Sequence, residues 1–265
     1  LTTPYTEGFE ATDTLTLARA TMSAGGLQAW DYFNENPIAR LRTQSAPDVP
    51  RTGSRAITLD VRRAVLNQNN QYNYLTGTFN LSNYNAGSHE VRLAFYYMHH
   101  GITQVPNAFG KVWVRGSDAD AWVECFDLGA AQNPIGGSWQ QVPDVNLSRV
   151  LLQAGQQFSA STQIRFGQFA QFSMADRFGF GGYSFDDVQL FLAENDAAIT
   201  AISAPAVSGC AVPENATVSV QVKNNMQVPL ANIPIRYRLN SGSWVQEVIA
   251  SLAAGATTTY HFTQK

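Results

Sequence analysis

The sequence contains little charge, little cysteine and no long apolar run. Only 14% of the 265 residues are charged, against about 25% in an average soluble domain. The polar surface must therefore come mostly from Asn, Gln, Ser and Thr, which suits β-rich extracellular proteins better than helical cytosolic enzymes. The net charge of −3 argues against a nucleic-acid partner, because such partners normally require a basic face. No run approaches the ~18 consecutive apolar residues of a transmembrane helix, so we expect no membrane span.

The two cysteines, Cys125 and Cys210, are far apart in the sequence. One pair cannot build the disulfide framework of a small secreted domain, and no C-x-x-C motif is present for zinc or redox chemistry. Two separate free thiols are the favoured interpretation, and a single bridge between them is the alternative.

What the sequence does contain is a series of short strand patterns separated by Gly, Asn and Pro turns. Residues 55–61 alternate apolar and polar side chains, as a half-buried strand should. Residues 111–115 and 121–128 are typical of a hairpin that turns at residues 116–118. The other strand-like runs of this part are 91–98, 163–169 and 185–192. Many short strands with such turns indicate an all-β fold, and more closely a β-sandwich or jelly roll.

Helical patterns are rare. Residues 147–154 are the one short candidate, with Asn146 or Ser148 near its start and Gly155 at its end. Because strands and helices do not alternate in βαβ order, a parallel sheet is not expected.

A boundary is expected near residues 194–196, which divides the chain into regions 1–193 and 194–265. Strand patterns beyond it cover 198–202, 216–222, 233–239, 244–249 and 257–262, and residues 240–243 provide a hairpin turn. A seven-stranded sandwich normally requires about 100 residues. We therefore expect a smaller immunoglobulin-like β-sandwich that is incomplete at its C-terminus.

A series of short motifs follow one another in the first region. They are 7–10 (EGFE), 53–60 (GSRAITLD), 112–118 (VWVRGSD), 122–123 (WV), 137–139 (GSW), 145–148 (VNLS) and 183–188 (YSFDDV). In their order and spacing, residues 1–193 resemble the MAM-like jelly-roll domains of secreted bacterial proteins. The resemblance implies a large jelly-roll sandwich.

The second region has motifs of its own, namely 196–202 (DAAITAI), 208–210 (SGC), 220–225 (VQVKNN) and 253–257 (AAGAT). It resembles the CARDB type of bacterial adhesion-related immunoglobulin-like domain. In such domains the chain continues past the position of Gln264 and Lys265 to complete the sheet. Both regions resemble modules of large proteins exported by type IX secretion, which implies a secreted or cell-surface location.

The sequence lacks the standard catalytic arrangements. His89 is followed by Glu90, as in a zinc-protease helix, but no second histidine stands four residues after the first. The segment 182–186 has Asp where a nucleophile elbow has Gly. The adjacent His99 and His100 point to opposite faces of a strand, so they cannot share a metal unless the chain turns after them. We therefore predict a protein that is not an enzyme.

Glu10, Asp186 and Asp187 are the candidate metal ligands. Calcium binds six to eight oxygens from carboxylates and carbonyls. The first and last strands of a jelly roll commonly lie side by side, so Glu10 and Asp187 should converge. The resemblance supports a structural calcium here, since related sandwiches often carry one. The alternative is that one Asp faces solvent while the other accepts backbone N–H bonds at the strand entry.

Phe172, Phe178 and Tyr183 are the candidate ligand-binding residues. They lie in the Gly-rich segment 167–183. Exposed aromatic faces bind sugar rings, whose C–H groups pack on the π surface, while Asn and Gln bond the hydroxyls. The alternative, which we favour, is that these rings are core residues flanking a wide turn.

The leading hypothesis is a non-catalytic binding or adhesion region of a larger secreted or cell-surface bacterial protein, with glycans or other cell-surface proteins as partners. The alternative is a structural or accessory spacer for an attached enzyme such as a protease, or a part of a surface filament. A hydrolase is the third hypothesis. It would require a cleft with coupled acid and base groups, which the sequence does not display.

Overall fold

The computed structural model describes residues 5–10, 20–21, 30–34, 39–45, 50–61, 73–101, 110–129, 138–168, 180–205 and 216–264. The chain divides into two compact units. The larger consists of residues 1–86 and 91–192, and the smaller of residues 87–90 and 193–265. Apart from one short helix, the described elements are β-strands, which confirms the all-β fold. No helix in this part of the chain is long and apolar enough to cross a membrane.

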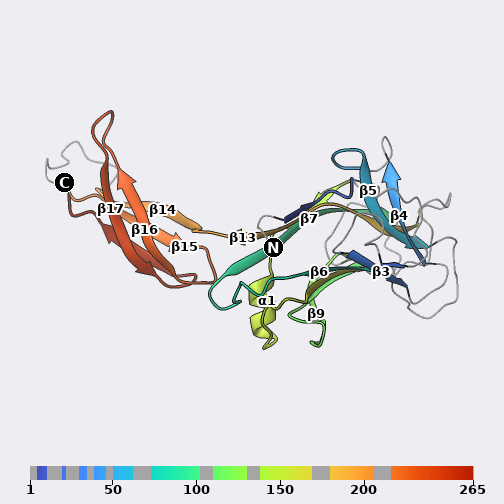
Figure 1. Cartoon of the computed structure of the whole chain (residues 1–265). Helices are drawn as coiled ribbons and strands as arrows, with labels where there is room; N and C mark the ends of the chain where they lie inside the picture. The colour runs from blue at the N-terminus through green and yellow to red at the C-terminus, as the bar shows by residue number, and fades with distance from the viewer. Residues whose placement is uncertain are drawn as a thin grey trace. The chain divides into compact units, whose positions relative to one another are not determined.

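The larger unit is a sandwich of two antiparallel sheets, and Figure 1 shows β4, β5 and β7 in one layer with β3, β6 and β9 in the other. Sheet A runs in the order β10 (Gln140–Gln141), β7 (Glu90–Gly101), β13 (Phe180–Ala193), β5 (Arg55–Val61) and β4 (Ala39–Ser45), with β1 (Tyr5–Glu7) on β13 and β11 (Val145–Asn146) on β7. Sheet B runs in the order β2 (Ala20–Thr21), β3 (Trp30–Asn34), β6 (Asn73–Phe79), β12 (Thr162–Gln168), β8 (Gly110–Arg115) and β9 (Val123–Asp127).

The core of this unit lies between the two sheets, because alternate side chains of each strand point inward. In β12, for example, Ile164 and Phe166 are buried, while Arg165 is half-buried on the other face. Phe95 and Phe185 of sheet A contact Phe166 of sheet B, with ring centroids 5.0 and 4.9 Å away. Aromatic packing therefore joins the two sheets.

Local sequence signals explain the connections. β8 and β9 form the hairpin that the turn residues predict. The helix α1 spans Leu147–Gln153, and the side chain of Asn146 caps it by accepting a hydrogen bond from the Arg149 N–H at 2.9 Å. The chain leaves the helix through Gly155, whose φ of +70° suits glycine. The predicted helix is therefore confirmed, with Asn146 and not Ser148 as its N-cap and with Gly155 directly after its end.

The smaller unit is a second, smaller sandwich. Its sheet C contains β14 (Ala197–Ala204), β15 (Ser219–Asn224) and β18 (Thr257–His261), and its sheet D contains β16 (Leu230–Tyr237) and β17 (Val245–Leu252). β16 and β17 pair as the predicted hairpin, with Asn240 at a φ of +50° in the turn. The buried residues between the sheets are Val220, Val222, Ile235, Ile249, Leu252 and Phe262.

Candidate functional site

The outer face of sheet B carries a group of aromatic and arginine side chains. Phe33, Tyr74 and Trp113 come from β3, β6 and β8, and each follows a residue that faces the core. Because successive strand residues point to opposite faces, these rings lie on the side away from the core. Arg165 of β12 and Trp122, which precedes β9, lie on the same face. The side chain of Phe33 is 59% exposed.

These side chains form a continuous series of ring contacts. Phe33 stacks on Tyr74 with centroids 6.4 Å apart and planes 17° apart. The Arg165 guanidinium lies over both Tyr74, at 4.5 Å, and Trp122, at 3.8 Å. Arg115 lies over Trp122 at 4.5 Å. We call Phe33, Tyr74, Trp113, Trp122, Arg115 and Arg165 the aromatic face.

A glycine in β12 allows two of the rings to approach. Gly167 pairs in register with Tyr74, and the Trp113 ring contacts Tyr74 edge-on at 5.9 Å. A Cβ at Gly167 would lie 2.5 Å from the Trp113 ring and 2.9 Å from the Tyr74 ring. The rings therefore lie against the backbone of β12, where any larger residue would push them away.

Polar side chains hold the arginines of the aromatic face in place. Arg115 donates from Nε to the Gln163 side chain at 2.7 Å, and Gln163 donates in turn to Thr78 at 2.9 Å. Arg165 donates from Nε to Thr76 at 3.3 Å. Such cross-strand contacts reduce the rotamer freedom of the long arginines. The face is thus ordered before any ligand arrives.

The predicted calcium ligands all contact one loop, residues 51–55, as expected from the pairing of the strands that carry them. β1 lies beside β13, with Glu7 opposite Val188. Glu10 accepts hydrogen bonds from the N–H groups of Ser54 and Arg55 and from the Ser54 hydroxyl. Gly53 has a φ of +61°, and a Cβ there would collide with the Glu10 carboxylate. Glu10 therefore fixes residues 53–55.

The two adjacent aspartates fix the start of the same loop. Asp186 is fully buried and accepts the N–H groups of Arg51, at 2.9 Å, and Thr52, at 3.3 Å. Burial raises its pKa to about 6, although the N–H bonds oppose the shift. Asp187 forms an ion pair with Arg51 and accepts the Thr52 hydroxyl at 2.7 Å. Arg51 in turn lies over the Tyr96 ring at 3.3 Å.

The contacts that the structure shows at these carboxylates are hydrogen bonds and one ion pair. Carboxylate oxygens are the right chemistry for calcium, but here N–H and O–H donors and one guanidinium already occupy them. Among the described residues, no group of three or more His, Cys, Asp or Glu side chains is arranged to hold a metal. Asp186 matches the alternative interpretation, in which it accepts backbone N–H bonds. Calcium binding by Glu10, Asp186 and Asp187 stays a prediction.

Tyr183 lies in the core and not on a loop, because β13 begins at Phe180. Its side chain is 1% exposed, and its ring stacks on His99 with centroids 4.8 Å apart. Tyr183 therefore offers no exposed face to a sugar. It is a core residue, as the alternative interpretation of its sequence expects. Phe172 and Phe178 lie outside the described residues.

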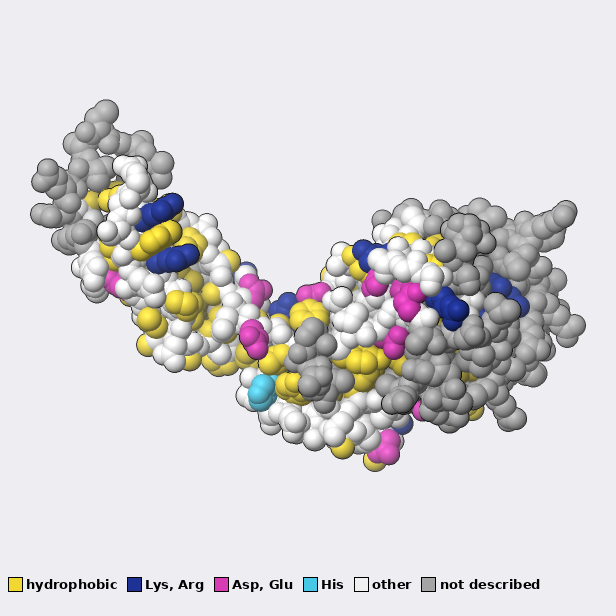
Figure 2. Space-filling model, turned by 45° about the horizontal axis from the view of Figure 1, so that its top comes forward, with side chains coloured by type: hydrophobic (Ala, Val, Ile, Leu, Met, Phe, Trp, Pro, Cys, Tyr) yellow, Lys and Arg dark blue, Asp and Glu magenta, His cyan; other side chains and the backbone are white. Residues whose placement is uncertain are grey.

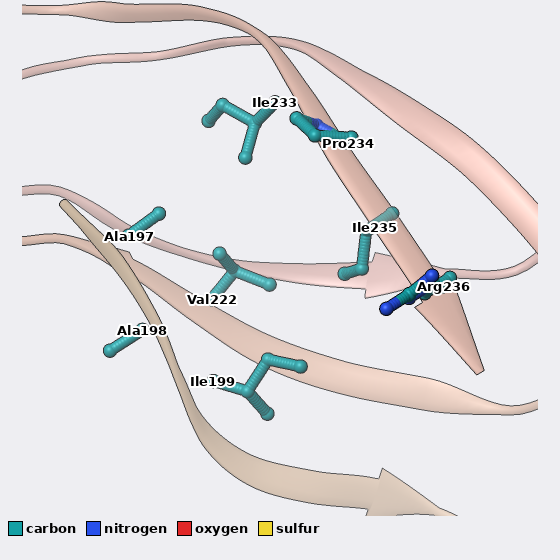
Figure 3. Close-up of a pocket in the computed structure, with 8 residues that line it drawn as sticks. All are labelled: Ala197, Ala198, Ile199, Val222, Ile233, Pro234, Ile235 and Arg236. Atoms are coloured by element: carbon teal, nitrogen blue, oxygen red, sulfur yellow. The ribbon is translucent and has the colours of Figure 1, made fainter. Parts of the chain in front are cut away.

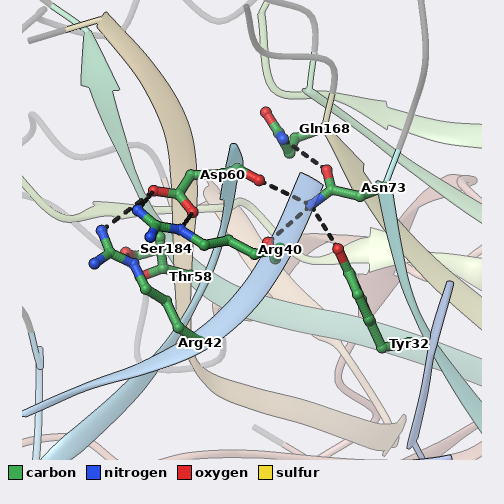
Figure 4. A network of polar contacts seen from close by, with 8 residues as sticks. All are labelled: Tyr32, Arg40, Arg42, Thr58, Asp60, Asn73, Gln168 and Ser184. Atoms are coloured by element: carbon green, nitrogen blue, oxygen red, sulfur yellow. Dashed lines mark hydrogen bonds and ion pairs between the residues drawn. The ribbon is translucent and has the colours of Figure 1, made fainter. Parts of the chain in front are cut away.

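A buried polar network joins sheets A and B (Figure 4). Asn73 of β6 donates to the backbone carbonyls of Arg40 and Asp60, at 3.0 and 3.3 Å, and accepts from Gln168 at 2.6 Å. The fully buried Asp60 carboxylate binds Arg40 through two bonds of 2.6 and 2.8 Å and Arg42 at 3.2 Å. The network therefore links β4 and β5 of sheet A to β6 and β12 of sheet B through polar contacts.

The same network includes a Ser–His pair. Ser184 lies between His100 and Thr58, at 2.6 Å from each side chain. A serine beside a histidine is part of many hydrolase sites, but Ser184 is fully buried and Asp60 is bound to two arginines. The Ser184–His100 pair is therefore interpreted as a structural contact within the larger unit. His100 contacts Ser184 whereas His99 stacks on the preceding residue, Tyr183, so the two histidines point to opposite faces of β7 as predicted.

Cys125 is a free thiol. Burial raises its pKa far above the usual range, so the reactive thiolate form is suppressed. It donates to the Val112 carbonyl at 3.4 Å. Cys210 lies outside the described residues.

No family model matches the chain, and no curated protein matches it. Several solved structures are similar to it. The K1 cleaved adhesin domain of Lys-gingipain from Porphyromonas gingivalis W83 has a TM-score of 0.42 and 16% identity, over 71% of this chain and 97% of that one. A family 30 carbohydrate-binding module of a Clostridium thermocellum cellulosomal cellulase has a TM-score of 0.39 and 14% identity, over 72% and 99%. The MAM-like and CARDB-type resemblances stay predictions.

Proposed function

We propose that the chain is a non-catalytic binding region of a secreted or cell-surface protein, and that the aromatic face of sheet B binds glycans. The observation that carries the proposal is the ordered series of rings on the outer side of a sheet, which ends in the 59% exposed Phe33. A single exposed ring is ordinary on a protein surface, but Phe33 continues into the rings of Tyr74 and Trp113. A contiguous group of surface rings is typical of a binding surface.

The chemistry of the face suits a sugar chain. The negative π surfaces of Phe33 and Tyr74 attract the polarised C–H groups of a pyranose ring. Asp31, two residues before Phe33 on β3, is exposed on the same face and can accept hydrogen bonds from hydroxyls. A ligand pocket of this kind combines apolar contact area with a few polar groups that fix orientation.

The test is a glycan-array screen of the whole chain. The wild type, a Tyr74→Ala/Trp113→Ala double variant and a Trp244→Ala control are labelled and applied at the same concentration. Trp244 is 49% exposed but belongs to the smaller unit. We expect the wild type and the control to bind the same glycans and the double variant to lose them. Absence of binding to any glycan by the wild type would refute the proposal.

A further inference from the structure

The smaller unit has an apolar groove between its two sheets. The residues that line it are mostly apolar, with one arginine at the end of the groove: Ala197, Ala198 and Ile199 of β14, Val222 of β15, and Ile233, Pro234, Ile235 and Arg236 of β16. Figure 3 shows the side chains of Ile199, Val222 and Ile235 extending into the space between the ribbons. Its volume is about 230 Å³, and a cavity of about 150 Å³ already holds a benzene ring. The groove therefore has room for more than one apolar side chain.

One wall of the groove is a strand with an open edge. Within the described residues, β16 pairs with β17 on one side and with no strand on the other. Such an edge presents unpaired N–H and C=O groups, which can pair with another strand. Pro234 lies in this strand, and proline in a sheet is confined to edges because it lacks an N–H donor. It removes one hydrogen bond from the edge and leaves the carbonyl acceptors.

The two faces of β16 have opposite character. Ile233 and Ile235 point toward the core of the unit. Arg236, and Arg238 directly after the end of the strand, alternate with the inward residues and are exposed. Both guanidiniums lie over the Trp244 ring, at 4.4 and 4.8 Å. Figure 2 shows two basic side chains on either side of a hydrophobic one on the smaller unit. In the part of the chain that the structure describes, neither arginine forms an ion pair.

We propose that this edge binds an extended segment of another protein, which adds to β16 as a third strand of sheet D. Side chains of an added strand alternate between the two faces with a period of two. Those on the inner face would fill the groove beside Ile233 and Ile235. Those on the outer face would lie next to Arg236 and Arg238, where acidic groups complement the charge. The segment is therefore an amphipathic strand with alternating apolar and acidic residues, and its recognition is strand addition.

A second copy of the chain is a poorer occupant. Antiparallel pairing of two β16 strands would bring two sets of Arg236 and Arg238 onto the same face. Like charges at neighbouring cross-strand positions are destabilising. The charge of the edge therefore selects against self-pairing and in favour of an acidic strand.

Three short fluorescein-labelled peptides test the proposal by fluorescence anisotropy at low salt. One alternates Val with Glu, one alternates Val with Lys and one alternates Thr with Glu. We expect the Val–Glu peptide to bind the whole chain at least ten-fold more tightly than the Val–Lys peptide, because only its charge complements the arginines. The Thr–Glu peptide should bind more weakly than Val–Glu, because its threonines fill the apolar groove poorly.

Variants of the protein separate strand addition from non-specific adsorption. An Arg236→Glu/Arg238→Glu double variant should reverse the preference and bind the Val–Lys peptide more tightly. Ile199→Asp, at the groove wall, should weaken binding at least five-fold. Ile202→Asp is the matched control, because Ile202 lies on the same strand, is 64% exposed and does not line the groove. Thermal melting of each variant confirms that it is folded.

The proposal is wrong if the wild type binds none of the peptides, or if the double charge reversal leaves the preference unchanged. It is also wrong if sedimentation shows a dimer of the chain that the same variants dissociate, because the occupant is then a second copy. The glycan proposal concerns the larger unit, so neither result affects it.

Discussion

The Nε2 atom of His100 lies 2.6 Å from the Oγ atom of Ser184. The pKa of His100 is lowered to about 4, mainly by burial and also by the neighbouring His99 and Arg42. The neutral imidazole is thus the form that the fold accommodates. His100 closes a row of polar side chains that crosses β7, β13 and β5, and this row makes the stability of the larger unit depend on pH.

The pH dependence has a definite sign. In the unfolded chain the pKa of His100 returns to its ordinary value of 6.5, so the unfolded state binds more protons between pH 6.5 and 4. Stability is therefore complete above pH 6.5 and falls as the pH falls toward 4, by about 3 kcal/mol at most. His100→Gln should flatten this part of the profile.

Urea unfolding at intervals between pH 7 and pH 4 provides the measurement. Asp186 contributes the opposite slope, because its pKa is raised to about 6 and its protonated form is favoured in the fold. Because Asp186 is present in both proteins, the difference in slope between His100→Gln and the wild type isolates the contribution of His100. Parallel profiles for wild type and His100→Gln would contradict the account of this row.

A second prediction concerns the buried ion pair at the end of the sandwich. Asp60→Ala leaves the guanidiniums of Arg40 and Arg42 without their carboxylate, although the two side chains are only 15% and 16% exposed. Removal of one partner of a buried pair costs about 3 to 5 kcal/mol. Equilibrium denaturation should show a loss of this size. A loss below about 1 kcal/mol would mean that water replaces the carboxylate.

The third prediction concerns Gly167. Replacement by Ala places a Cβ against the rings of Trp113 and Tyr74 and should move both rings on the surface. We expect glycan binding to fall about ten-fold, equivalent to about 1.4 kcal/mol, while the melting temperature changes little. Gln189→Ala, at an exposed position of β13 in sheet A, is the control. Equal binding by Gly167→Ala and wild type would show that the ring positions do not matter.

The fourth prediction concerns the loop at residues 51–55. Asp187→Asn removes the ion pair with Arg51 and should lower stability by about 1 kcal/mol, because the pair is partly exposed. The same variant tests the predicted calcium site. A bound ion requires the wild type to melt at a higher temperature in calcium than in chelator, and the variant to lose that difference. Equal melting of the wild type in both solutions would remove calcium from the site.

Local patterns were sufficient to predict the elements whose contacts are local. The alternation in residues 55–61 corresponds to β5, the turn at 116–118 to the β8–β9 hairpin, and the caps around 147–154 to α1. The convergence of Glu10 and Asp187 on one loop followed from the pairing of the first and last strands. In each case a short-range rule, or one general rule of jelly rolls, determines the outcome.

The aromatic face could not be predicted in this way. Its side chains come from β3, β6, β8 and β12 and from the segment before β9, and only the register between these strands brings the rings together. For Tyr183 the sequence suggests a surface position that the structure does not show, because the glycines before it are typical of a loop whereas the residue lies in β13. A spacing of two from Phe185 places both rings on the same face of a strand, and that period could have assigned Tyr183 to the core.

The most direct test of the central proposal is a calorimetric titration of Phe33→Ala beside the wild type. The ligand is the glycan that binds best on the array. Phe33 is exposed and contributes little to the core, so the variant should fold normally. If the aromatic face is the binding site, the variant binds about ten-fold more weakly, as expected when a stacking ring is removed. Equal affinity of a folded Phe33→Ala variant and the wild type would contradict it.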